Sequence, residues 1–216
     1  MHVVIINGSP RVQKFSNTDK IITSFAKGLV EAGASYEVYS ISNRNEWDAA
    51  RNAFISQEHI IIALPLYVEC VSSLLLEFLE TIPVERQKPA QLSFILHGGF
   101  TEGHQLRLGE RFLQSLPAQL GCTYGGCLTK GGSFFIRFTD EKPVQELLNS
   151  YIPMGRMYVE KGNFYFSEAT KFTGPEYYPL LIRWLIEFMF KVVANKKFDK
   201  YAHEWGCTLP LDNTPY

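Results

Sequence analysis

Near its start the chain reads Val3-Val4-Ile5-Ile6-Asn7-Gly8-Ser9-Pro10, and the polar triplet Ser16-Asn17-Thr18 follows a few residues later. An unbroken apolar run that ends at turn residues is typical of a strand buried on both faces. Ser, Asn and Thr are favoured helix N-caps, and apolar residues then recur at helical spacing as far as Gly33. This part of the sequence predicts a strand, a polar loop and a helix.

The same alternation repeats along the next hundred residues. Further strands are predicted at residues 36–41, 60–64, 92–96 and 121–128. Further helices are predicted at residues 47–54, 74–82 and 106–120, the last of them kinked or split by Pro117. Strands that alternate with helices form a parallel sheet with right-handed crossovers. We therefore predict an α/β fold built on a three-layer, doubly wound, five-stranded parallel sheet.

Composition excludes several classes of protein. The 21 Lys and Arg residues nearly balance the 22 Asp and Glu residues, which argues against a general nucleic-acid binder. The 4 cysteines and 5 histidines are scattered without the spacing of metal ligands, so no metal site is expected. The N-terminus shows no signal-peptide pattern, and we expect a cytoplasmic protein.

Ligands of doubly wound sheets bind at the carboxyl ends of the strands. That rule selects three loops, at residues 8–17, 65–72 and 97–104. The first loop combines hydroxyl, amide and guanidinium groups and leads into a helix N-terminus, which is an arrangement that binds phosphate. Since Gln13 stands where a P-loop needs its second glycine and no dinucleotide fingerprint is present, a phosphate monoester fits this loop best.

The three loops together resemble those of a known family. Gly8-Ser9-Pro10-Arg11 with Ser16-Asn17-Thr18 is similar to the FMN-phosphate loop of the flavodoxin-like NAD(P)H-dependent FMN reductases, which are relatives of flavodoxins and multimeric flavodoxin-like quinone reductases. Leu64-Pro65-Leu66-Tyr67, and the helix after it, resemble the second flavin loop of that family. His97-Gly98-Gly99 resembles the third. The resemblance covers about residues 2–130.

The resemblance implies a flavodoxin-like sheet of strand order 2-1-3-4-5 and an FMN cofactor. It implies that the phosphate is held by Ser9, Arg11, Ser16, Asn17 and Thr18. The residues expected along the flavin are Pro65, Leu66, Tyr67, Val68, His97, Gly98 and Gly99. For His97, as for Glu102 and His104, a surface role is the alternative to contact with flavin or substrate. No catalytic side chain is expected, because the flavin would carry the chemistry.

The implied activity is hydride transfer from NADPH or NADH through FMN to a small-molecule acceptor, namely a quinone, nitro, azo or flavin compound. Two alternatives remain open at this point. One is a flavodoxin-like electron carrier that docks a redox partner, although carriers of that kind tend to be strongly acidic and this chain has a net charge of −1. The other is an FMN-binding module without reductase activity.

The last part of the chain is rich in aromatic residues, because 18 of the 30 in the whole sequence lie after residue 130. We expect one domain over residues 1–216, with an FMN-binding core at 1–130 and a helical, aromatic extension at 131–216. Residues 178–194 predict an amphipathic helix that covers the sheet as the last helix of the fold. Its charges argue against a membrane span, and we expect the surplus apolar surface to pack in a homodimer or over the active site.

Overall fold

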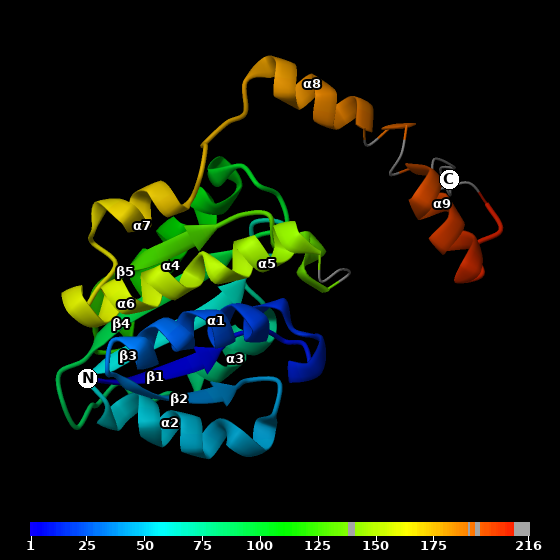
Figure 1. Ribbon diagram of the computed structural model, residues 1–216. Coiled ribbons are helices and arrows are strands. Elements are labelled where there is room, and N and C mark those ends of the chain that lie inside the picture. Colours follow the sequence, from blue (N-terminus) through cyan, green and yellow to red (C-terminus); the bar gives the residue numbers. More distant parts are fainter. Residues whose placement is uncertain (138–140, 190, 193–194, 210–216) are drawn as a thin grey trace. The chain divides into compact units, whose positions relative to one another are not determined.

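The computed structural model describes residues 1–137, 141–189, 191–192 and 195–209. Five parallel strands form one sheet in the order β2-β1-β3-β4-β5, which confirms the predicted topology. The strands are β1 (His2–Asn7), β2 (Ser35–Ser40), β3 (His59–Pro65), β4 (Gln91–His97) and β5 (Thr123–Lys130). The predicted strands agree with these bounds to within about two residues (Figure 1).

Helices cover both faces of the sheet. One face carries α2 (Trp47–Ser56), α3 (Ser73–Glu80) and α4 (Arg107–Gln119), and the other carries α1 (Asn17–Glu31), α5 (Lys142–Asn149) and α6 (Tyr151–Lys161). Successive residues of β1 pack into different cores, Val3 and Ile5 with α1 and α6, Val4 and Ile6 with α2 and α3. Both faces are therefore buried, which explains the unbroken apolar run.

Local capping sets the limits of α1. The Ser16 hydroxyl oxygen accepts a hydrogen bond from the Asp19 N–H at 3.3 Å, so Ser16 is the N-cap that the sequence predicts. Past the last turn, Gly33 adopts φ of +80°, a left-handed conformation that ends the helix and suits glycine. The start of α1 is thus held directly after the first loop.

The prediction that Pro117 kinks or splits its helix is wrong in one respect, because α4 runs unbroken through it. Pro117 lies in the last turn of α4. A proline there removes only one intrahelical hydrogen bond, so the helix ends soon after it and is not divided.

On the α1 face of the sheet, α6 packs beside α1, in the place that we expected residues 178–194 to take. Tyr151 and Tyr158 of α6 are fully buried in the same core as Phe25 of α1. Phe164 lies against both Phe25 and Tyr158, with ring centroids 6.0 and 4.8 Å apart. Part of the aromatic surplus after residue 130 therefore fills this second core.

The chain divides into two compact units, Met1–Glu176 and Tyr177–Tyr216. The first unit contains the sheet and ends with α7 (Ser167–Phe172). The second contains α8 (Leu180–Met189), whose residues are all exposed or half-buried, and α9 (Asn195–Glu204). Residues 190 and 193–194 of the predicted helix lie outside the described residues. None of the described helices is long and apolar enough to cross a membrane.

Candidate ligand-binding site

The three loops selected from the sequence meet at the carboxyl edge of the sheet. The Gly8 N–H donates to the Ala63 carbonyl at 2.8 Å, and the Leu66 N–H donates to the His97 carbonyl at 2.8 Å. Gly98, directly after β4, donates its N–H to the Lys130 carbonyl at 3.1 Å. These bonds continue the parallel register beyond the strands and hold the loops after β1, β3, β4 and β5 side by side.

The first loop presents its polar groups in two directions. Ser9 is 1% exposed; its N–H donates to Asn7 Oδ1, and its hydroxyl oxygen accepts the Arg11 N–H at 3.3 Å. Arg11 itself extends into solvent. Asn17 is half-buried and donates from Nδ2 to the Ser133 carbonyl at 2.8 Å. Ser9 and Ser16 are thus used to shape the loop, while the Arg11 guanidinium remains on its surface.

The side chain of Thr18 points into the protein. It is 1% exposed, and its Oγ1 lies 2.9 Å from Nε2 of His97. His97 is 2% exposed, so the alternative of a surface role for it is wrong. Burial lowers the pKa of His97 to about 3, which keeps the imidazole neutral.

A cavity of about 530 Å³ lies over the N-terminus of α1. Three cationic residues contribute to its wall, and no aspartate or glutamate does. Its lining consists of Arg11, Val12, Lys14, Phe15, Ser16, Asn17 and Lys20. The N–H groups of Asn17 and Thr18, in the first turn of α1, have no preceding intrahelical acceptor. Positive side chains and the positive end of a helix dipole together favour an anion here.

The second loop is a strained two-residue turn. Tyr67 and Cys70 exchange backbone hydrogen bonds of 2.9 and 3.0 Å, and the residues between them, Val68 and Glu69, have φ of +47° and +67°. Turns with two positive φ values favour Asn-Gly, and a valine in this region is unfavourable because its side chain is β-branched. Val68 is also 96% exposed, so packing does not compensate the strain.

Replacing this turn by Asn-Gly is therefore expected to stabilise the protein. The double variant Val68→Asn with Glu69→Gly should raise the free energy of unfolding by about 1 kcal/mol, because residues held in sparsely populated conformations cost about 1–3 kcal/mol each. Urea denaturation measures this change in the free energy of unfolding. Val84→Asn is the matched control, since Val84 is also exposed but has no positive φ. If the double variant and Val84→Asn change the free energy of unfolding equally, strain in the turn is not the cause.

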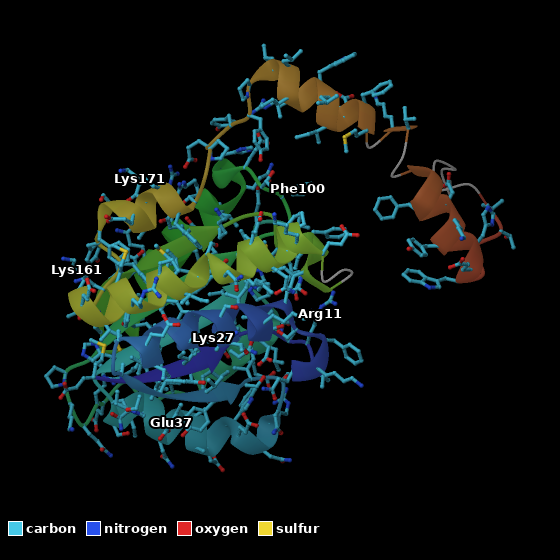
Figure 2. The ribbon with its side chains drawn as sticks, in the orientation of Figure 1. Arg11, Lys27, Glu37, Phe100, Lys161 and Lys171 are labelled. Carbon is cyan, nitrogen blue, oxygen red and sulfur yellow. The ribbon has the colours of Figure 1, made fainter. Side chains whose placement is uncertain are left out.

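The third loop brings small residues and an aromatic ring to the same edge. Gly98 is buried, Gly99 is exposed, and Phe100 is 70% exposed. Figure 2 shows Phe100 and Arg11 at the end of the first unit toward which the strands point, with Lys161 at the opposite end. His104 Nδ1 lies 2.9 Å from the carbonyl oxygen of Glu176. Glu102 is half-buried at the start of the next turn. Neither lines the cavity.

Exposed apolar side chains come from all the loops at this edge. Each loop exposes at least one large apolar side chain, although exposed side chains of this size are normally scattered. The residues, from the loops after β1, β3, β4 and β5, are Val12, Phe15, Tyr67, Val68, Phe100 and Phe134. An anion site beside an apolar rim suits a ligand that has both a phosphate and a planar ring.

Two buried polar atoms at this edge have no partner among the described residues, namely Asn7 Nδ2 and Asn17 Oδ1. A buried polar atom without a partner is costly, so both fit a ligand with matching hydrogen-bonding groups. Sequence patterns did not indicate Asn7 or Ser133 as site residues. The signal for Ser133 is weak: it follows Gly131-Gly132, just beyond the last strand, in a fourth loop at this edge.

Neither a protein-family model nor a curated protein sequence matches the chain.

Several solved structures are similar to it. An NAD(P)H:quinone oxidoreductase from Methanothermobacter marburgensis has 16% sequence identity and a TM-score of 0.57, over 72% of this chain and 98% of that one. An NADH:FMN oxidoreductase in its apo form has 18% identity and a TM-score of 0.55, over 81% and 96%. An FMN-dependent NADH-azoreductase from Bacillus anthracis, solved in complex with FMN, has 15% identity and a TM-score of 0.53, over 73% and 98%. The chain therefore has the flavodoxin-like α/β fold that these oxidoreductases share.

Proposed function

We propose that the chain is an FMN-binding oxidoreductase that takes hydride from NADPH or NADH and passes it to a quinone, nitro, azo or flavin acceptor. The observation that carries the proposal is a cavity lined by three cationic residues over the N-terminus of α1, together with exposed apolar side chains on the loops at the same carboxyl edge of a flavodoxin-like sheet. The three similar solved structures, all oxidoreductases that use NAD(P)H or NADH, support the same activity.

Different residues at the edge would bind the two ends of FMN. Arg11, Lys14 and the free N–H groups at the start of α1 would hold the phosphate of FMN. The turn at Tyr67 and Val68 and the glycines Gly98 and Gly99 would lie along the ring, where small residues let the backbone approach it. When bound, the flavin supplies hydride acceptance and donation, and the protein supplies binding and orientation.

The experiment that tests the proposal is a flavin titration of the purified full chain. We expect a flavin absorption spectrum, either as isolated or after addition of FMN, and bleaching of that spectrum by NADPH or NADH. A preparation that does not bind FMN would exclude the proposal. If FMN binds but neither nicotinamide bleaches it without a partner protein, the electron-carrier alternative is supported in its place.

The phosphate end of the site gives a sharper prediction. Arg11→Gln should weaken FMN binding about tenfold, because a hydrogen bond to a charged group contributes more than a neutral one. Binding of riboflavin, which has the same ring but no phosphate, should not change. Fluorescence titration at two salt concentrations measures both affinities.

Lys27→Gln is the matched control for Arg11. Lys27 is also an exposed cation, it lies on α1, and it is ten residues beyond the helix start and does not line the cavity (Figure 2). We expect it to bind FMN as the unmodified chain does. Equal weakening of FMN and riboflavin by Arg11→Gln, or equal effects of the two variants, would place the phosphate elsewhere.

We further propose a homodimer in the cytoplasm. The apolar side chains of the second unit support a dimer, since Leu180, Leu181, Trp184 and Phe188 are all more than half exposed. The four cysteines, all of which are free, support a reducing compartment. Light scattering on the full chain tests the dimer, and the mass of a single chain would contradict it.

A further inference from the structure

A chain of hydrogen bonds runs through the buried base of the site. Thr18 Oγ1 lies 2.9 Å from His97 Nε2, and His97 Nδ1 lies 2.8 Å from Ser133 Oγ. The Ser133 hydroxyl donates to the Gly98 carbonyl at 2.8 Å, and the Ser133 N–H donates to the same oxygen at 2.9 Å. Three segments that are distant in sequence, at α1, β4 and the turn after β5, meet on one imidazole.

The number of protons fixes the direction of these bonds. A carbonyl oxygen can only accept, so the single hydroxyl proton of Ser133 goes to Gly98, and Ser133 Oγ must accept from His97 Nδ1–H. A neutral imidazole has one N–H, so Nε2 accepts from the Thr18 hydroxyl. In the opposite tautomer the buried Thr18 proton would have no acceptor among the described residues, which is costly.

The direction has a consequence at each end of the chain. At the first end, the Thr18 hydroxyl proton is committed to His97, so only the backbone N–H of Thr18 is available to a phosphate. At the other end, two hydrogen bonds from Ser133 fix the Gly98 carbonyl. In a trans peptide the next N–H points opposite to the carbonyl, so the Gly99 N–H points away from Ser133. No described residue accepts a hydrogen bond from it.

We propose that His97 is a positioning residue which, as the tautomer protonated on Nδ1, locks the start of α1 and the Gly98–Gly99 peptide into one arrangement. The helix start is thereby aligned for the phosphate, and the Gly99 N–H is turned toward a hydrogen-bond acceptor on the ring. This inference rests on the proposed function, because it assigns the two ends of one ligand to the two ends of the hydrogen-bond chain.

Two measurements on the full chain test it, and only one of them requires FMN. The first is the tautomer of His97 from its ring ¹⁵N chemical shifts. We expect Nδ1 protonated and Nε2 unprotonated, and an increased population of the Nε2–H form in Ser133→Ala. A His97 ring protonated on Nε2 in the unmodified chain would overturn the proposal.

The second measurement is FMN affinity in a threonine series. Thr18→Val keeps the shape of the side chain but removes the hydroxyl, so we expect about tenfold weaker binding, while Thr18→Ser should restore affinity to within about twofold. Thr23→Val is the matched control, because it removes an exposed hydroxyl bond to the Asp19 carbonyl on the same helix. Thr18→Val with unchanged affinity would overturn the proposal.

The two measurements separate the two inferences. If the unmodified chain does not bind FMN, the proposed function fails and the positioning role of His97 fails with it, whatever the tautomer. If FMN binds and Thr18→Val binds it equally well, the function stands and the positioning role fails alone.

Discussion

Replacing Gly28 or Gly155 by alanine is expected to lower the free energy of unfolding by about 3 kcal/mol, although alanine is the better helix former. Gly28 lies on α1 and Gly155 on α6, and the two glycines face each other where these neighbouring helices pack together. Figure 1 shows α1 and α6 side by side. A Cβ atom on Gly28 would overlap the Ile152 carbonyl oxygen. One on Gly155 would overlap the Phe25 carbonyl oxygen and lie 3.1 Å from the Cα of Gly28. Both clashes are with backbone atoms, so the helices would have to move apart.

Urea or thermal unfolding of the two variants measures the effect. Gly109→Ala is the matched control, since Gly109 is also a buried helical glycine. Its added Cβ would lie 2.6 Å from Cδ1 of Leu66, at the end of a flexible side chain that can rotate away. We expect a change within about 1 kcal/mol for this control. Similar losses in all three variants would show that the close helix crossing is not the cause.

The free energy of unfolding is expected to fall as the pH is lowered from 6.5 to 5, and His97 should account for about 2 kcal/mol of that loss. Burial lowers the pKa of His97 in the folded protein to about 3, whereas the unfolded histidine titrates near pH 6.5. Below pH 6.5 the unfolded chain binds a proton that the folded chain excludes. The contribution is thus fully favourable above pH 6.5 and is progressively lost toward pH 3.

His97→Gln tests this by comparison at several pH values. The variant loses the bond to Ser133 and is expected to be less stable at pH 7.5, but its deficit should shrink by about 2 kcal/mol at pH 5. His59→Gln is the control, because burial also lowers the pKa of His59, which is only half-buried, so its effect should have the same sign and be smaller. A deficit of His97→Gln that does not depend on pH would contradict the prediction.

The strands and the first helices follow from local patterns. The run at Val3–Ile6 is apolar at every position because both faces of β1 are covered, and Ser16 and Gly33 mark the limits of α1 by their capping chemistry. These are properties of residues close together in the chain, so they can be recognised from the sequence. The covering helix could not be identified in this way, because α6 and residues 178–194 both have apolar stripes.

For the candidate site, too, local features could be predicted from the sequence and contacts between distant residues could not. The sequence located the loops at Ser9, Tyr67 and Gly98, since the carboxyl ends of parallel strands lie at one edge. It did not show that Thr18 is turned inward onto His97, or that Ser133 completes the chain of hydrogen bonds. Thr18 and His97 are separated by 79 positions, and no local spacing relates them.

By itself, then, the sequence determined the α/β alternation and which loops share the carboxyl edge of the sheet, and it predicted that the first of these loops binds phosphate, because periodicity and capping act over one or two turns of chain. The tertiary structure decided which helix covers the sheet, how closely Gly28 and Gly155 bring two helices together, and which way Thr18 and Gly98 face. Those features depend on packing and hydrogen bonding between distant segments, whose partners exist only once the sheet has brought them into contact.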